Sequence, residues 1–330
     1  MDAAIPRITV GRYTDASGAS GLQRFRVEGD RLVREAELAL PSPSWTTWAP
    51  DGRIVAVSEL PESRVSVVSH DADGFALVSS TPTQGADACH VSVSPDGAHL
   101  AVANYGSGSA LVIANPSDGD LTHADRRLVT FEGSGPVAGR QDQPHAHEAV
   151  WTDPGHVLVN DLGSDVIRRL SLGPDGDVAE DLPIVVPPGF GPRHLRLRGR
   201  DEIVVVGELS GEVLSLRHRE GEWMIVGRVS ASGSGRRPKP SAVLLHDDGL
   251  LVANRDVNTV ARFAWDADGS LSLQWEAPCG GDLPRDMQLG HGLLWFAFQD
   301  SGEVVAHRMQ GSELVEVIRH PVEGAARVLL

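Results

Sequence analysis

The sequence predicts an all-β protein, a seven-bladed β-propeller of four-stranded antiparallel blades formed by residues 1–330 as a single domain. Three observations lead to this prediction. Short apolar runs alternate with Gly, Asp and Pro along the whole chain, and no long segment shows the 3.6-residue period of a helix. A hairpin pattern recurs about every 46 residues, the length of one propeller blade. The 36 Gly and 21 Pro residues are spread along the chain, as many turns require.

Six segments share the hairpin pattern, in which an apolar strand, a polar turn and a second apolar strand end at a polar residue. In the second segment a strand that begins at His90 leads through Pro95-Asp96-Gly97 to a strand that ends at Asn104. Counting back 47 residues from the first of the six strand ends reaches Arg12, in a further copy of the pattern. The six strand ends are Glu59, Asn104, Asp161, Glu208, Asn254 and Gln299, with spacings of 45, 57, 47, 46 and 45 residues.

The start of each hairpin is expected 14 residues before its strand end, at Trp45, His90, His147, His194, Pro240 and Arg285. The midpoints are turn-forming residues, namely Gly52, Gly97, Pro154, Asp201, Asp247 and Gly292. An antiparallel hairpin with its turn at such a midpoint brings both members of the pair to the same end of the blade. Twelve positions from six blades are therefore predicted to converge at one mouth of the central channel.

The N-terminal unit is incomplete, and we expect the two ends of the chain to complete it together. Its outer strands are predicted at 21–27 and 32–38, and Arg327-Val-Leu-Leu supplies the missing innermost strand. Joining N- and C-terminal strands closes the ring and removes its exposed edges. The 57-residue interval holds about 11 extra residues in or near 131–143, a Gly-rich segment predicted to be a lid at the same face.

Charge and composition restrict the partners. The chain has 29 basic and 45 acidic residues, a net charge of −16, so neither nucleic acid nor an anionic membrane is an expected partner. Its two cysteines give no disulfide framework. The chain starts without a signal-peptide pattern, and no apolar run approaches the ~18 residues of a membrane span. We expect a cytoplasmic protein, and a monomer because a closed ring leaves no strand edge to cover.

The converging positions are rich in arginine, histidine and carboxylates, a set that suits a small anionic molecule with a carbonyl to be polarised. His145 and His147 lie two apart on an extended segment, so only one can easily face the channel, and the hairpin offset favours His147. The His-x-His spacing also occurs in metal sites, but no convincing third ligand is present, and we predict no metal and no cofactor. Purely structural interpretations stay open: Asp161 as a loop-ordering residue, a bonded histidine, or inert ion pairs of the arginines.

Several motifs in this order resemble the seven-bladed propeller lactonase family, which includes a bacterial 6-phosphogluconolactonase and the fungal carboxy-cis,cis-muconate lactonising enzyme. They are Val10-Gly-Arg-Tyr-Thr14, Pro144-His-Ala-His147, Asn160-Asp-Leu-Gly-Ser-Asp165, Gly191-Pro-Arg-His194, Glu208, Ala253-Asn-Arg255, Pro284-Arg-Asp286 and Gln299-Asp-Ser. The resemblance implies a metal-independent site at the channel mouth, with His145 or His147, Arg193, Glu208 and Arg255 as catalytic residues. The expected substrate-binding residues are Arg12, His90, Asn104, Asp161, His194, Asn254, Arg285, Asp286 and Gln299.

The function predicted from these residues is hydrolysis of a sugar-acid lactone, above all 6-phosphogluconolactone. Arg193 is expected to stabilise the oxyanion, and Glu208 or His147 to take a proton from the attacking water. Arg255, with Arg285 or Arg12, is expected to hold a remote phosphate or carboxylate. Three alternatives stay open: lactonisation of a carboxylated muconate, a non-catalytic propeller that binds proteins, and a calcium-dependent six-bladed lactonase.

Overall fold

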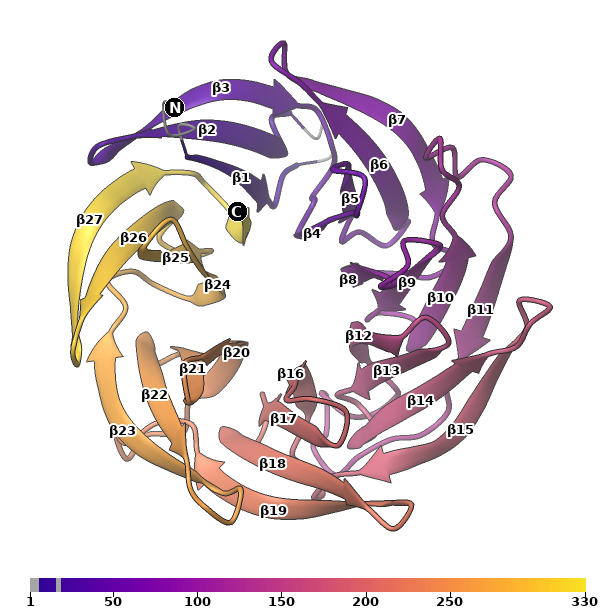
Figure 1. Cartoon of the computed structure of the whole chain (residues 1–330), viewed down its shortest axis with the longest axis vertical. Helices are drawn as coiled ribbons and strands as arrows, with labels where there is room; N and C mark the ends of the chain where they lie inside the picture. The colour runs from indigo at the N-terminus through magenta and orange to yellow at the C-terminus, as the bar shows by residue number, and fades with distance from the viewer. Residues whose placement is uncertain (1–5, 16–18) are drawn as a thin grey trace.

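The computed structural model describes residues 6–15 and 19–330. These residues form 28 strands in seven four-stranded sheets and contain no helix. Figure 1 shows the sheets arranged radially as the blades of one ring. In every blade the innermost strand pairs antiparallel with the second strand. The predicted all-β, seven-bladed propeller is therefore confirmed.

The first three complete blades follow one another along the chain, each with its innermost strand first. Blade 1 consists of β4 (Trp45–Trp48), β5 (Ile54–Val57), β6 (Arg64–His70) and β7 (Phe75–Pro82). Blade 2 consists of β8 (Ala88–Val93), β9 (His99–Asn104), β10 (Ser109–Ala114) and β11 (Arg126–Thr130). Blade 3 consists of β12 (Ala146–Asp153), β13 (His156–Asp161), β14 (Val166–Leu172) and β15 (Val178–Val185).

The next three blades repeat this order. Blade 4 consists of β16 (Pro192–Leu197), β17 (Glu202–Gly207), β18 (Glu212–Arg219) and β19 (Glu222–Ser230). Blade 5 consists of β20 (Lys239–His246), β21 (Gly249–Arg255), β22 (Thr259–Trp265) and β23 (Leu271–Pro278). Blade 6 consists of β24 (Pro284–Gly290), β25 (Leu293–Phe298), β26 (Glu303–Gln310) and β27 (Glu313–Pro321).

The closing blade joins the two ends of the chain, as predicted. Its strand order is β28 (Ala325–Leu329), β1 (Arg7–Arg12), β2 (Leu22–Glu28) and β3 (Arg31–Leu38), so the C-terminal strand is innermost. A buried ion pair fastens β28 to blade 6: Nη1 of Arg327 lies 2.9 and 3.0 Å from the two carboxylate oxygens of Asp286. The same carboxylate accepts a hydrogen bond from the backbone N–H of Val328 (3.0 Å).

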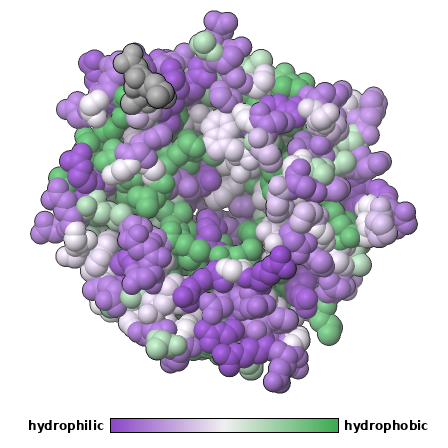
Figure 2. Space-filling model, viewed as in Figure 1, coloured by the Kyte–Doolittle hydropathy of each residue, from purple (hydrophilic) through white to green (hydrophobic). Residues whose placement is uncertain are grey.

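The core lies between the blades. Each of seven apolar clusters joins two neighbouring blades, and together they occupy all seven gaps of the ring. Second strands such as Ile54–Val57 and Leu293–Phe298 are buried on both faces, because a blade packs on each side of them. Figure 2 shows one face of the ring, where hydrophilic residues dominate and apolar residues lie mainly among the blades.

Candidate active site

A recurring bulge aims side chains into the mouth of the channel. In six blades the register between the innermost and second strands shifts by one residue near the start of the innermost strand. A bulge of this kind bends the strand and redirects the extra residue. The bulge residues are Cys89, His147, Arg193, Ser241, Arg285 and, in the closing blade, Ala326. The ends of the second strands lie at the same mouth, so the two sets converge.

A cavity of about 200 Å³ lies where these residues meet. Four of the predicted site residues line it, and they come from blades 3, 4, 5 and 6: His147, Glu208, Arg255 and Arg285. The other lining residues are Glu59, Cys89, Tyr105 and Arg140. The cavity therefore combines three arginines, two carboxylates and one imidazole in a small volume.

Glu208 is the electrostatic centre of the cavity, because three guanidinium groups bind its carboxylate. Oε2 accepts hydrogen bonds from Arg255 (2.6 Å) and Arg193 (3.1 Å), and Oε1 accepts one from Arg140 (2.6 Å). Burial alone would raise the pKa of Glu208, but Arg255 and Arg193 hold it well below its usual range. Glu208 is therefore a stable carboxylate and a weak proton acceptor.

Arg193 lies behind Glu208 and does not line the cavity. Its side chain is 2% exposed, and besides Glu208 it donates to His194 Nε2 (3.2 Å) and to the carbonyl of Ser241. Burial, with the charge of Arg255, lowers the pKa of Arg193 to about 9. These contacts hold the Arg193 guanidinium against Glu208, and it does not line the cavity where an oxyanion would form.

Of the two histidines of the His-x-His motif, only His147 lines the cavity. Its Nδ1 is buried without a hydrogen-bond partner in the described part of the chain. Burial and Arg193 lower the pKa of His147 well below the ordinary histidine value, so the ring is neutral near pH 7. His145 instead stacks on Tyr105 with ring centroids 4.4 Å apart, and its Nδ1 donates to the Tyr105 carbonyl (2.9 Å).

A second group of charged side chains, formed around Arg285, also lines the cavity. Arg285 donates to Glu59 Oε2 (3.0 Å), and the hydroxyl of Tyr13 donates to the same oxygen (2.7 Å). The guanidinium of Arg285 lies 5.0 Å from the centre of the Tyr13 ring. Burial opposes the charged form of Arg285, but Tyr13 and Glu59 outweigh it and raise its pKa. Arg285 is thus fixed in position with its charge retained.

Two further predicted residues lie one layer deeper in the channel. The His194 ring is 5.4 Å from that of His147 and 5.2 Å from that of Trp45, and the His90 ring is 4.4 Å from Trp45. Burial lowers the pKa values of His90 and His194 well below normal. These rings pack the channel behind the cavity and do not line it.

None of the remaining predicted binding residues lines the cavity: Arg12, Asn104, Asp161, Asn254, Asp286 and Gln299. Asp161 binds Arg168 (2.7 Å) and the backbone N–H groups of His145, Gly163 and Ser164, which is the loop-ordering role left open above. Asp286 belongs to the ring closure. Arg12 donates to three backbone carbonyls, while Asn104 and Asn254 each donate to one.

Arg140 shows how the predicted lid contributes to the site. The segment 131–143 reaches the cavity, and Arg140 also lies 3.4 Å from the hydroxyl of Tyr105. Its neighbour Gln141 is fully buried and donates to the Leu162 carbonyl and to Asp165 (both 2.8 Å). Glu59, Cys89, Tyr105 and Arg140 were absent from the predicted site. Glu59 stands among the strand ends and Arg140 in the predicted lid, so both had a signal in the sequence.

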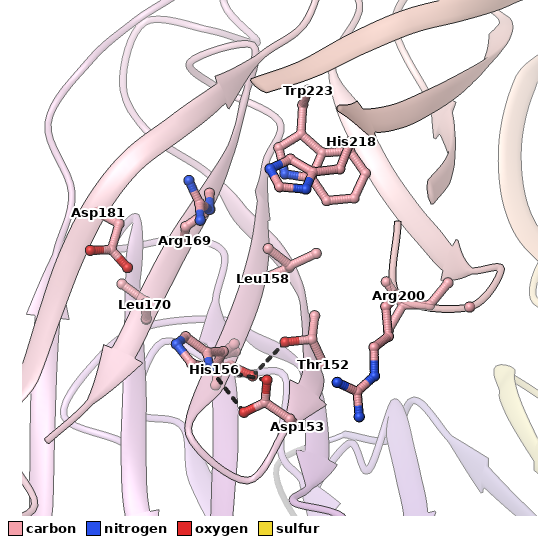
Figure 3. A pocket seen from close by; sticks show the side chains of 13 residues that line it. Thr152, Asp153, His156, Leu158, Arg169, Leu170, Asp181, Arg200, His218 and Trp223 are labelled. Carbon is pink, nitrogen blue, oxygen red and sulfur yellow. Dashed lines mark hydrogen bonds and ion pairs between the residues drawn. The ribbon is translucent and has the colours of Figure 1, made fainter. Parts of the chain in front are cut away.

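A second cavity, of about 230 Å³, lies between blades 3 and 4 near the hairpin turns, at the other end of the blades. Figure 3 shows Arg169 and Arg200 on opposite sides of it, with the tilted rings of Trp223 and His218 in contact at one end. Asp153 accepts a hydrogen bond from His156 Nδ1 (2.9 Å); burial alone would raise the pKa of Asp153, but this bond and the nearby Arg200 lower it. Arg169 faces Asp181 across two strands, but no carboxylate here binds three guanidinium groups as Glu208 does. No group of three or more His, Cys, Asp or Glu side chains within residues 6–15 and 19–330 is placed to hold a metal ion.

A small, cation-rich cavity at the channel mouth of a closed propeller has the form of a binding or catalytic site for a small anionic molecule. The chain belongs to the family described as lactonase, 7-bladed beta-propeller, whose model matches residues 7–328. The resemblance carried by the sequence motifs is confirmed, and the protein is an enzyme of the lactone-hydrolysing class.

Three relatives illustrate the similarity. The chain is 28% identical over 314 residues to the 6-phosphogluconolactonase of Bacillus subtilis, covering 90% of this chain and 89% of that one. It is 26% identical over 336 residues to the 6-phosphogluconolactonase of Formosa agariphila, covering 95% and 92%. The structure of the periplasmic gluconolactonase of Pseudomonas aeruginosa matches with a TM-score of 0.87, 25% identity and 98% coverage of both chains. No helix in the described residues is long and apolar enough to cross a membrane.

Proposed function

We propose that this protein hydrolyses 6-phosphogluconolactone to 6-phosphogluconate without a metal ion. The observation that carries the proposal is the composition of the cavity. Arg140, Arg255 and Arg285 line it and Arg193 stands behind it, against the two carboxylates Glu59 and Glu208. This excess of positive charge suits an anionic substrate. Relatives named 6-phosphogluconolactonase that align over about nine-tenths of the chain support the choice of lactone.

The proposed reaction begins with attack of water on the lactone carbonyl carbon. His147 is the general base, because it is the neutral imidazole in the cavity and both oxygens of Glu208 are occupied by guanidinium groups. A positioned base typically accelerates such a step ~10²–10⁴-fold. The Glu208 carboxylate favours the imidazolium that forms. The ring C–O bond then breaks, and the imidazolium returns the proton to the departing alkoxide.

The arginines divide the remaining work. Arg255 faces the cavity from the end of β21 and stabilises the oxyanion, the role that the buried Arg193 cannot reach. Arg285, fixed by Glu59 and Tyr13, holds the polar groups of the sugar. Arg12 takes no part, since its guanidinium is bound to backbone carbonyls. The protein acts as a monomer, because a closed ring leaves no strand edge to cover. It acts in the cytoplasm, because a charged sugar phosphate does not cross membranes unaided.

The test is hydrolysis of 6-phosphogluconolactone and of unphosphorylated gluconolactone by the purified protein with a chelator present, corrected for the spontaneous reaction. We expect activity that the chelator leaves unchanged and that His147→Asn and Glu208→Gln abolish or strongly reduce. Arg200→Met, in the second cavity of Figure 3, is the matched control and should retain full activity. Loss of activity on chelation would overturn metal independence. A carboxylated muconate, assayed in parallel, distinguishes lactonisation from hydrolysis.

A further inference from the structure

We propose that Arg140 determines specificity by binding the substrate's phosphate, and that it leaves Glu208 to do so. The inference rests on the proposed function and deepens it. Arg140 belongs to none of the propeller strands; it lies in the segment 131–143 between β11 and β12. It is therefore an addition to the repeating blade pattern, placed on a site that the blades alone already form.

The position of Arg140 suits a remote substituent. Its side chain is 37% exposed, compared with 11% for Arg255 and 15% for Arg285, so it stands at the outer rim of the cavity. In 6-phosphogluconolactone the phosphate is several bonds from the lactone carbonyl. When the carbonyl lies between His147 and Arg255, the phosphate extends away from the buried wall and toward the rim.

Arg140 is also the arginine that the site can release most easily. Arg193 and Arg255 both bind Glu208 Oε2, and together they already outweigh its single negative charge. Arg140 binds the other oxygen, Oε1, as a third cation. Arg285 has its own counter-ion in Glu59. Exchanging Glu208 for a phosphate therefore leaves no buried carboxylate unpaired, and a guanidinium forms two parallel hydrogen bonds with a phosphate.

Hydrogen bonds hold the backbone around Arg140. The exchange of Glu208 for a phosphate therefore moves the Arg140 side chain and leaves the segment in place. Gln141 anchors the segment to blade 3 through Leu162 and Asp165. Within the segment, the N–H of Gly135 donates to the Gln141 carbonyl (2.8 Å), and the N–H of Gly139 donates to Asp142 (3.0 Å). The second contact of Arg140, with the Tyr105 hydroxyl at 3.4 Å, is long for a hydrogen bond and restrains it weakly.

The experiment measures kcat/KM for 6-phosphogluconolactone and for gluconolactone in the wild type, Arg140→Met, Arg140→Lys and the control Arg200→Met. The readout is the ratio of the two kcat/KM values, in which any general damage to the site cancels. We expect Arg140→Met to lower this ratio ~10–100-fold through KM, the range expected for charge-assisted hydrogen bonds to a phosphate. Arg140→Lys should restore part of the ratio, and Arg200→Met should leave it unchanged.

The outcomes separate this inference from the proposed function. If the wild type hydrolyses neither lactone, the proposed function falls and the inference falls with it. If the wild type hydrolyses both lactones but Arg140→Met leaves the ratio unchanged, the function stands and the assignment of Arg140 is wrong. Affinity for the product 6-phosphogluconate, measured by calorimetry without turnover, gives a second readout, and an equal affinity in wild type and Arg140→Met would also overturn the assignment.

Discussion

Glu208→Gln removes one negative charge from the site while nearly preserving the shape of the side chain. The carboxylate is the counter-ion of Arg193, whose side chain is 2% exposed, and of Arg255, which is 11% exposed. Removing one partner of a buried ion pair typically destabilises a protein by about 3–5 kcal/mol. We expect a cost near the lower value, because one of the three arginines, Arg140, is 37% exposed and is solvated by water when the carboxylate is lost. At an unfolding entropy of ~2.1 cal/mol/K per residue, about 3 kcal/mol lowers the Tm of this chain by about 4 °C.

The assay compares Glu208→Gln with Glu202→Gln by thermal and urea unfolding at pH 7. Glu202 begins the same strand, β17, and pairs with Arg198 (3.0 Å) and Arg217 (2.7 Å), but its side chain is 25% exposed. Exposed pairs of this kind contribute about 0–1 kcal/mol, so the control should unfold almost as the wild type does. Equal Tm values for the two variants would refute the conclusion that Glu208 neutralises a buried arginine. Glu208→Gln should also lower kcat/KM ~10²-fold or more.

Three further predictions concern the channel histidines and the ring closure. His90, His147 and His194 have pKa values well below normal in the folded protein, whereas the unfolded chain takes up their protons near pH 6.5, so stability should fall as pH drops below that value. Each histidine contributes up to ~1.4 kcal/mol per pH unit, and urea midpoints for His194→Gln should show a shallower pH dependence than the wild type between pH 7 and 5. If His147 is the base, kcat/KM should stay constant as pH falls through 6.5 and decline only at lower pH; an acid limb centred at or above 6.5 would contradict this. Asp286→Asn, which leaves Arg327 buried without its counter-ion, should cost about 3–5 kcal/mol, whereas Asp248→Asn, whose carboxylate is 86% exposed to solvent, should cost under ~1 kcal/mol by the same urea assay.

Sequence periodicity predicted the ring because each blade packs against its two neighbours in the same way. The second strand of each blade is packed between two neighbouring blades. This packing requires the same apolar run and the same turn residues at a nearly constant interval. The closing strand was predictable for a related reason. An N-terminal unit with outer strands and no innermost strand leaves an edge, and the apolar tail ending in Arg327-Val-Leu-Leu fits that edge.

The fixed hairpin offset failed at the level of single side chains. Arg193 lies 15 residues before Glu208, whereas His147 lies 14 before Asp161, because Glu208 follows the last residue of β17 and Asp161 is itself the last residue of β13. A displacement of one residue along a strand moves a side chain to the other face. The offset of 14 therefore reaches His194, one residue past the bulge at Arg193, which the motif Gly191-Pro-Arg-His194 had identified.

The same error occurred in blade 2 for a different reason. Its hairpin is one residue longer than that of blade 3, since Ala88 pairs with Asn104 whereas Ala146 pairs with Asp161. The offset of 14 therefore selected His90 in place of Cys89. The bulge that decides between such neighbours has no sequence signature strong enough to place it.

The repeat spacing could not predict which loop residues enter the cavity. Arg140 reaches a carboxylate 68 residues further along the chain, and its direction depends on the buried amide of Gln141 and the turns at Gly135 and Gly139. The insertion predicted that a segment covers the site face, but not which side chain enters the cavity. Tyr105 follows the strand end Asn104 directly, and its ring is fixed by stacking on His145, a contact between two different blades.

The site also spans the joint at which the ring closes, so closure and catalysis are coupled. Arg285 belongs to blade 6, its counter-ion Glu59 follows β5 of blade 1, and Tyr13 from the closing blade binds the same carboxylate. The next residue after Arg285 is Asp286, which holds the C-terminal strand through Arg327. Loosening that strand must displace one wall of the cavity, because adjacent residues of one bulged strand serve both purposes. Asp286→Asn should therefore lower kcat/KM even under conditions where the protein remains folded, whereas Asp248→Asn should not.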